Sequence, residues 1–204
     1  MSKPRERHLV IFARAPRFGT VKRRLARDIG QLAAWRFHRD TTVRLLRRVA
    51  RDPRWRTWLA VTPDRAARGG SGLWPGPHIV IAQGPGDLGA RMGRVLQRLP
   101  PGPVVIVGSD IPGIERHHVA AAFRALDRHD WVIGPAADGG YWLIGARRRS
   151  RRRLPFAGVA WGGPNVRTQT LANLAGQSVA FLEELIDIDH GADLERWRRE
   201  RSRA

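Results

Sequence analysis

Residues 103–113 read Pro-Val-Val-Ile-Val-Gly-Ser-Asp-Ile-Pro-Gly, and this stretch decides the fold class of the chain. Its apolar run is continuous rather than alternating, which is typical of a central parallel strand buried on both faces. Other short β-rich runs flank it and alternate with helical patterns, as in βαβ units. The 204 residues therefore predict a single-domain α/β fold, with a mostly parallel, doubly wound sheet flanked by helices.

Periodicity assigns the remaining elements outward from this strand. Strands are expected at residues 8–13, 56–62, 78–82, 131–134, 141–145 and 178–181, and helices at 31–51, 90–99, 115–128, 165–175 and from Ala192. The helix at 31–51 is supported by an apolar stripe of Leu32, Trp35, Val43, Leu46 and Val49, and a weaker helical pattern begins at Val21. The ends, residues 1–7 and 198–204, are expected to be flexible basic tails.

The strongest compositional signal is a net charge of +19 with a pI of about 11.9. Such a charge attracts anions, among them nucleic acids and phosphorylated metabolites. The basic residues are almost all arginine, which a codon bias would also produce, and dense runs occur only at 147–153 and 196–203. Because no nucleic-acid-reading motif accompanies the charge, we do not expect nucleic acid to be the main partner.

The chain has no cysteine, which excludes disulfides, thiolate metal sites and a cysteine nucleophile. The apolar run at residues 9–13 is too short for a signal peptide or a membrane span. We therefore expect a cytoplasmic protein.

Asp110 is the sharpest local signal, because it follows the buried strand directly and is fixed by Ile111-Pro112. Ligands of open parallel sheets bind at the carboxyl ends of the strands. A carboxylate in that position can hold a divalent cation against a diphosphate, or contact a ribose. The alternative is a helix cap, but Asp110 lies several residues before the helix expected from residue 115.

The loop after the first strand has the composition of a phosphate-binding element. Gly19 allows close backbone approach, and the helix that follows would direct free N–H groups at an anion. Arg14, Lys22 and Arg23 add charged donors. The spacing matches neither a Walker loop nor a dinucleotide fingerprint, and a basic surface loop is the alternative.

Two glycine-containing turns lie at other strand ends. Asp87 and Gly89 could form a wall of the nucleotide pocket or an ordinary capped helix start. Asp138 and Gly139 are a standard hairpin-turn pair, yet the segment around them would also suit a sugar or an acceptor.

The last strand is followed by Asp187 and Asp189, one of which could complete a metal site, although carboxylates at strand ends are often simple caps. His117 and His118 are expected on a helix surface without ligand partners. Ser109 lacks a nucleophile elbow, which argues against a hydrolase.

Five segments taken in order resemble a known family. They are FARAPRFGTVKRRL, QGPGDLGARM, GSDIPGI, GPAADGGYWLIG and DIDHGADL. Together they resemble a bacterial family of the nucleotide-diphospho-sugar transferase superfamily that is provisionally assigned as GT-A-type glycosyltransferases. Some of its members are linked to arsenosugar biosynthesis. The likeness extends from His8 to about Trp197. The superfamily also contains nucleotidyltransferases, including molybdenum-cofactor and phospholactate guanylyltransferases.

This resemblance implies roles for particular residues. Nucleotide and phosphate contacts fall to Arg14, Ala15, Pro16, Gly19, Lys22, Arg23, Asp87, Gly89 and Arg91, metal ligation to Asp110 with Asp187 or Asp189, and the acceptor or sugar side to Gly139, Gly140, Tyr141 and Trp161. The chain departs from the family pattern in two places. The family commonly has Lys near Arg14 and Thr at Arg23, and Arg-Trp-Ser where this chain has Ala160-Trp161-Gly162.

The sequence thus leads us to expect glycosyl transfer from a nucleotide sugar to an unknown acceptor. Mg²⁺ or Mn²⁺ on Asp110 would neutralise the departing diphosphate, assisted by Lys22 and Arg14, with Asp138 as general base. One alternative is nucleotidyl transfer from an NTP to a phosphorylated acceptor with release of pyrophosphate. The other is a non-catalytic fold that binds polyanions through its arginines.

Overall fold

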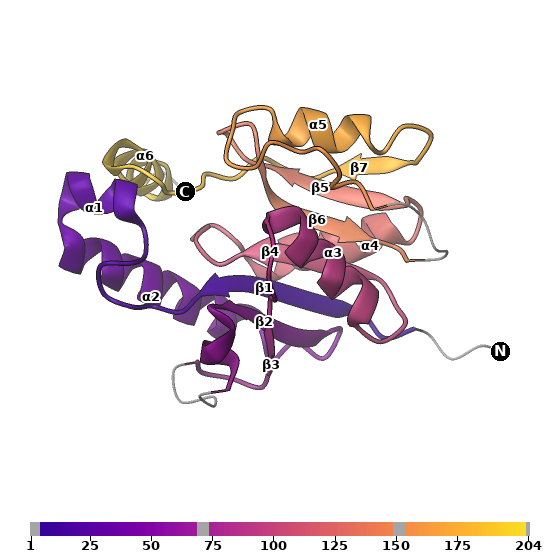
Figure 1. Cartoon of the computed structure of the whole chain (residues 1–204), viewed down its shortest axis with the longest axis horizontal. Coiled ribbons are helices and arrows are strands. Elements are labelled where there is room, and N and C mark those ends of the chain that lie inside the picture. Colours follow the sequence, from indigo (N-terminus) through magenta and orange to yellow (C-terminus); the bar gives the residue numbers. More distant parts are fainter. Residues whose placement is uncertain (1–4, 69–73, 149–153, 203–204) are drawn as a thin grey trace.

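The computed structural model describes residues 5–68, 74–148 and 154–202, which form one seven-stranded sheet with helices packed on it (Figure 1). The strands are β1 (His8–Arg14), β2 (Arg56–Thr62), β3 (Ile79–Ala82), β4 (Val104–Gly108), β5 (Trp131–Pro135), β6 (Tyr141–Ala146) and β7 (Val179–Phe181). The helices are α1 (Arg23–Ile29), α2 (Gln31–Val49), α3 (Leu88–Arg98), α4 (Arg116–Leu126), α5 (Val166–Ala172) and α6 (Gly191–Arg201), with a 3-10 turn η1 (Asp64–Ala67).

The sheet has the strand order β3-β2-β1-β4-β6-β5-β7. β1 pairs in parallel with β2 and β4, β2 with β3, and β5 with β7, whereas β6 runs antiparallel to β4 and β5. The predicted α/β fold with a mostly parallel sheet is therefore confirmed.

β4 is central because its side chains are buried on both faces of the sheet, as its unbroken apolar run predicts. Val105 and Val107 pack into one core with side chains of α2 and α4. Val104 and Ile106 pack into a second core on the other face, with side chains of α3. Helices thus cover both faces, which is the doubly wound arrangement.

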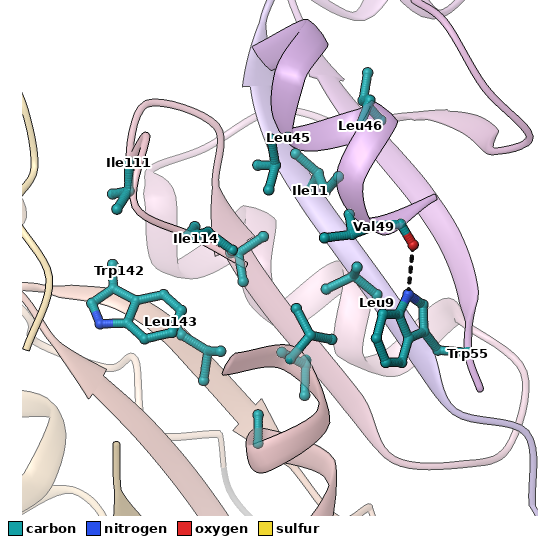
Figure 2. Close-up of a cluster of buried hydrophobic side chains, with 14 of the residues drawn as sticks. Leu9, Ile11, Leu45, Leu46, Val49, Trp55, Ile111, Ile114, Trp142 and Leu143 are labelled. Atoms are coloured by element: carbon teal, nitrogen blue, oxygen red, sulfur yellow. Dashed lines mark hydrogen bonds between the residues drawn. The ribbon is translucent and has the colours of Figure 1, made fainter. Parts of the chain in front are cut away.

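Figure 2 shows the first of these cores, in which β1 supplies Leu9 and Ile11 and α2 supplies Leu45, Leu46 and Val49. At its edge Trp55 stacks on Phe123, with ring centroids 5.9 Å apart. The Trp55 indole N–H donates to the Val49 carbonyl at 3.0 Å, which satisfies the last turn of α2 (Figure 2).

The strand order places the functional edge of the sheet. From β1 the chain moves outward to β2 and β3, and from β4 it moves to the opposite side, so β1 and β4 flank the topological switch point. The crevice at the carboxyl ends of such strands is where open α/β sheets bind ligands. The loop that contains Lys22 follows β1, and Asp110 follows β4.

A third, smaller core joins α1 and α2 to the C-terminal helix α6. Leu25 of α1, Ala34 of α2, Ile188 and Leu194 of α6 pack against one another. α1 and α6 accordingly lie side by side at one end of the molecule, away from the centre of the sheet (Figure 1).

The predicted tails and helical stripe need correction. α6 continues to Arg201, so residues 198–201 are helical, and the backbone at Arg7 accepts a hydrogen bond from the Arg56 N–H at 2.8 Å. Residues 1–4 and 203–204 lie outside the described residues.

The predicted apolar stripe of α2 differs from the buried face of this helix at Leu32, which is 49% exposed. The buried face includes polar side chains such as His38 and Thr42, which a pattern of apolar residues leaves out.

Of the Arg-rich run at 147–153, residues 149–153 lie outside the described residues. Arg148 is half-buried and donates to the carbonyls of Leu99 and Pro100 at 2.9 and 2.8 Å, where α3 has just ended. In the described ranges, no helix is both long and apolar enough to cross a membrane.

Asp52, between α2 and β2, generates a prediction about stability. Its buried carboxylate accepts hydrogen bonds from the backbone and guanidinium of Arg54, with Nη2 2.6 Å away. The Arg54 side-chain hydrogen bonds hold the pKa of Asp52 below its ordinary value of 3.8. At neutral pH, Asp52→Asn should therefore lower the free energy of unfolding by about 1–3 kcal/mol.

Because the pKa of Asp52 is lower in the folded state than in the unfolded state, its contribution to stability is present above the unfolded-state pKa. This contribution is lost as the pH falls through the folded-state pKa. The difference between wild type and Asp52→Asn, measured by urea unfolding, should thus narrow below about pH 4. Asp127→Asn, which removes an exposed partner of Arg7, is the control and should change stability by less than about 0.5 kcal/mol. A difference that stays constant down to acidic pH would contradict this assignment.

Candidate active site

The ammonium of Lys22 lies among three carboxylates at the carboxyl edge of the sheet. Its Nζ is 3.0 Å from Asp110 Oδ2, 3.2 Å from Asp187 Oδ1 and 2.8 Å from Asp189 Oδ1. Asp110 follows β4, and the other two follow β7 by several residues. The Lys22 side chain is only 5% exposed, whereas all three carboxylates are partly open to solvent. We call these four residues the lysine–carboxylate cluster.

Burial and the opposing charges of the cluster shift the pKa of Lys22, Asp110 and Asp187. Burial alone would raise the pKa of Asp110, but the Lys22 ammonium outweighs it and holds the pKa below its ordinary value. Burial, together with the charges of Asp110 and Asp189, raises the pKa of Asp187 to about 7 despite Lys22. Burial would lower the pKa of Lys22, but the three carboxylates outweigh it and raise that pKa, so the amine stays charged.

The backbone of Lys22 is also unusual, with φ 45° and ψ 49° in the left-handed region. A non-glycine residue there costs about 1 kcal/mol, so surrounding contacts must hold it. Its carbonyl accepts the Ala26 N–H at 2.8 Å and begins α1. The left-handed turn therefore joins the loop after β1 to the helix, and it lies at the residue whose side chain enters the cluster.

The loop at residues 14–20 is anchored from behind by side chains of other elements. Trp35 Nε1 donates to the Pro16 carbonyl at 2.7 Å, and His38 Nε2 lies 2.9 Å from the Arg14 carbonyl. Because a carbonyl only accepts, His38 Nε2 carries the proton, and burial lowers the pKa of this histidine. Gln83, after β3, donates to the Ala13 carbonyl at 3.3 Å.

Sequence reasoning missed His38 and Gln83, and it took Trp35 as core packing. Two signals were available in retrospect. Gln83 is a polar residue directly after a predicted strand, and His38 stands among hydrophobic positions of a strongly helical segment.

A cavity of about 530 Å³ opens beside the lysine–carboxylate cluster. Its lining comprises Arg14, Thr20, Val21, Lys22, Arg23, Arg24, His38, Asp110 and Asp189. A smaller cavity of about 240 Å³ adjoins the same loop and includes Ala15, Arg17 and Arg65. The site thus combines carboxylates with several arginines, which suits an anionic phosphate chain and a cation together. A larger cavity of about 1100 Å³ lies at the opposite, amino ends of the strands.

The segment after β3 has a structural role that the sequence left open. The Asp87 carboxylate accepts the Ala90 N–H at 2.8 Å and caps α3, while Arg91 Nε donates to the Gly86 carbonyl at 2.8 Å. A Cβ on Gly89 would lie 2.6 Å from a ring carbon of Trp161. Gly89 is buried, and its lack of a side chain makes room for Trp161. Its backbone is therefore not open to a ligand.

The turn between β5 and β6 is similarly filled by protein. The Asp138 Oδ1 accepts the Gly140 N–H at 2.9 Å, and Asp138 is exposed. Gly139 has φ 87°, and a Cβ there would lie 1.9 Å from the Pro164 carbonyl oxygen. The glycine thus allows the turn to contact the segment that follows Trp161. Gly140 is half-buried, and its N–H is used by the turn.

Two side chains predicted for the acceptor side, Tyr141 and Trp161, carry buried polar atoms. The Tyr141 hydroxyl interacts with the Thr170 side chain, whereas Trp161 Nε1 has no hydrogen-bond partner among the described residues. Burial raises the pKa of the Tyr141 hydroxyl, which stays protonated at neutral pH. Unpartnered buried donors of this kind are uncommon.

His117 and His118 were expected to lie on the surface without partners, and this is wrong for His118. His118 is buried. In the described ranges, it forms a group of possible metal ligands with His117 and Glu183, in which one ligand atom from each residue lies within 4.8 Å of the others. The Glu115 N–H donates to His118 Nδ1 at 2.8 Å, so Nε2 carries the proton toward Glu183, 2.8 Å away. A metal on Nε2 would need that proton on Nδ1, where the Glu115 N–H already points.

The structure brings together Lys22, Asp110, Asp187 and Asp189, with Arg14 and Arg23 in the lining of the adjoining cavity. Ala15 and Pro16 belong to the loop, and Gly19, at φ 74°, has open space where a Cβ would lie. Asp87, Gly89, Arg91 and Asp138 make their contacts outside the lysine–carboxylate cluster.

The anchoring of the loop by Trp35 can be tested directly. Trp35→Phe keeps an aromatic ring but removes the hydrogen bond to the Pro16 carbonyl, a loss of about 1 kcal/mol. Amide hydrogen exchange at residues 17–20 should then be about five times faster, while exchange in β1 stays unchanged. Trp131→Phe in β5 removes a comparable indole hydrogen bond, to the Gln177 side chain at 3.0 Å, and is the matched control that should leave the loop unchanged. Equal exchange in Trp35→Phe and wild type would refute the anchoring role.

Comparisons with known proteins agree with this fold. A family model described as "Uncharacterized protein conserved in bacteria (DUF2064)" matches residues 45–163. No curated protein matches the chain. A crystal structure from Desulfovibrio desulfuricans G20, provisionally identified as a nucleotide-diphospho-sugar transferase, is similar with 32% identity and a TM-score of 0.88, over 95% of this chain and 87% of that chain.

More distant structures share the fold alone. A nucleotidyl transferase from Methanothermobacter thermautotroptrophicus aligns with 18% identity and a TM-score of 0.61, over 97% of this chain and 98% of that one. Rv0371C from Mycobacterium tuberculosis H37Rv, solved in complex with manganese, aligns with 17% identity and a TM-score of 0.54, over 95% and 98%. With more than half of its length matched by the family model, the chain belongs to the bacterial DUF2064 family and has a fold like that of nucleotide-diphospho-sugar transferases.

Proposed function

We propose that this protein is a cytoplasmic transferase that moves a glycosyl group from a nucleotide sugar to an acceptor. The observation that supports this most is the lysine–carboxylate cluster at the switch point between β1 and β4, beside a basic loop. That edge is the ligand-binding position of open α/β sheets. The 32% identical structure is itself provisionally identified as a nucleotide-diphospho-sugar transferase.

The donor set of the cluster fits a divalent cation such as Mg²⁺ or Mn²⁺. Asp110, Asp187 and Asp189 offer carboxylate oxygens, which hard cations prefer, and three carboxylates with one ammonium leave a net charge of −2 when all are ionised. We propose Asp110 and one of Asp187 and Asp189 as the ligands. When bound, the cation would offset the negative charge that develops on a departing diphosphate. A structural neighbour was solved with manganese.

The basic loop would hold the phosphates. Arg14, Arg23 and Arg24 line the cavity beside the cluster, where their guanidinium groups can pair with phosphate oxygens in a bidentate manner. The exposed position of Gly19 leaves its backbone open to close approach. Lys22 would contribute its ammonium to the same phosphates and stabilise the leaving group.

The acceptor would approach from the β5–β6 side. The buried indole N–H of Trp161 has no hydrogen-bond partner among the described residues, and a sugar or acceptor hydroxyl could satisfy it. Tyr141, which packs in the same core as Trp161, would lie beside it. Gly139 and Gly140 would shape this side through the turn rather than by direct contact. Asp138 is our candidate general base for the acceptor hydroxyl, acting through the carboxylate that now accepts the Gly140 N–H.

Nucleotidyl transfer is the second candidate, and one observation favours it. The two cavities around the loop include Arg14, Arg17, Arg23 and Arg24 besides Lys22, a charge that would suit a triphosphate as well as a diphosphate. In that reaction a phosphorylated acceptor attacks the α-phosphorus of an NTP, and pyrophosphate leaves.

Ligand binding separates these functions. In thermal-shift and calorimetric measurements, UDP- or GDP-sugars with Mn²⁺ should stabilise wild type, by about 2–3 kcal/mol at a hundred times the dissociation constant. Selective stabilisation by NTPs with release of pyrophosphate would instead favour nucleotidyl transfer. Tight, salt-dependent DNA binding with no nucleotide effect would favour the non-catalytic polyanion-binding alternative.

Asp110→Asn tests the position of the metal. Removing this charge should abolish the Mn²⁺-dependent part of nucleotide binding and lower any transfer rate by about 100-fold or more. The control is Asp40→Asn on the exposed surface of α2, which changes the net charge equally and should leave binding unchanged. Metal-dependent binding that persists in Asp110→Asn would show that the cation lies elsewhere.

A further inference from the structure

Lys22 occupies the position of a cation within the cluster. Its Nζ lies 3.0 Å from an oxygen of Asp110, 3.2 Å from one of Asp187 and 2.8 Å from one of Asp189. The proposed function assigns ligands of a divalent metal from among these same carboxylates. An ammonium and a metal ion therefore depend on the same residues.

The two cations cannot both be held in this arrangement. Mg²⁺ or Mn²⁺ bonds to carboxylate oxygens at about 2.0–2.3 Å, so a metal on two of these oxygens would lie within about 5 Å of Nζ. The Lys22 side chain is almost fully buried, and the repulsion between the charges would be weakly screened by water. One cation must leave or move when the other binds.

We propose that Lys22 is a built-in counter-ion that opposes metal binding until the phosphates of the nucleotide substrate draw its ammonium out of the cluster. Nucleotide and metal then bind cooperatively, because each favours the same displaced position of Lys22. This inference rests on the proposed function, since it assigns an order and a coupling to the same site.

The surroundings of Lys22 allow this displacement. The cavity of about 530 Å³ beside the cluster includes Lys22 in its lining, together with Arg14 and Thr20 of the loop. A lysine has a flexible four-carbon stem and a compact charge, so its head can move between two anionic partners without backbone rearrangement. With all three carboxylates ionised, the net charge of the cluster changes from −2 to −3 when the ammonium leaves, which increases its attraction for a divalent cation.

The test is the affinity of the protein for Mn²⁺ alone, measured by calorimetry or by electron paramagnetic resonance without nucleotide. Lys22→Met keeps the length of the side chain and removes its charge, and it should bind Mn²⁺ about tenfold more tightly than wild type. Lys22→Arg keeps the charge and should not bind more tightly. Arg27→Met, on the exposed side of α1, controls for the change in net charge.

A second measurement follows the coupling. Adding UDP or GDP should tighten Mn²⁺ binding to wild type by about tenfold or more, and this gain should be smaller in Lys22→Met, where only direct contact between the diphosphate and the cation contributes. Where Lys22→Met is too unstable to purify, the comparison is made between Asp187→Asn and Lys22→Met/Asp187→Asn, in which one repelling carboxylate is neutral. Unchanged or weaker Mn²⁺ binding by the folded variant would overturn the inference.

The inference and the proposed function can fail separately. If wild type binds no nucleotide, the proposed function fails, yet tighter Mn²⁺ binding by Lys22→Met would still show that Lys22 competes with the metal. If nucleotide and Mn²⁺ bind wild type but the affinity for Mn²⁺ is independent of Lys22, the function stands and the counter-ion role is refuted. Absence of Mn²⁺ binding from both proteins refutes the inference and the metal part of the function.

Discussion

The parallel pairing of β1 with β4 is the constraint on which the site depends. Its register sets His8 opposite Val104 and Phe12 opposite Gly108, so both strands run toward the same edge of the sheet, with β1 continuing to Arg14. Lys22 and Asp110, 88 positions apart in the sequence, are thereby carried to one edge. β7 continues toward the same edge through its parallel pairing with β5, and the bridge between Ala136 and Leu185 extends that direction toward Asp187. Short-range sequence features matter here only because this register aligns them.

The sequence predicted the parts of the molecule that depend on local pattern. The apolar run of β4 and the position of Asp110 after it were both readable, because burial on two faces leaves an unbroken hydrophobic stretch. The partners of Lys22 could not be predicted from the sequence, because Asp187 and Asp189 are 165 and 167 positions away and contact it only in the folded chain. Lys22 was assigned to phosphate, but its contacts in the structure are carboxylates.

Glycines show the same limit. A glycine in the sequence shows that a Cβ is absent, but it does not show which neighbouring group occupies the space. At Gly89 and Gly139 the space is taken by Trp161 and by the Pro164 carbonyl, whereas at Gly19 it is open. Only Gly19 leaves its backbone open to a ligand, although the sequence suggested ligand contacts near all three glycines. His38, on the buried face of α2, was missed for a related reason, because its partner is the Arg14 carbonyl at the end of β1.

The small core formed by α1, α2 and α6 lies beside the segments that carry the charged residues of the site. Leu25 lies three residues after Lys22, and Ile188 lies between Asp187 and Asp189, and both are fully buried in this core. The spacing of opposite charges in the site is therefore fixed by hydrophobic packing at the periphery of the molecule. Leu194 of the last helix packs in the same core, so α6 helps to position the segments that carry Lys22, Asp187 and Asp189.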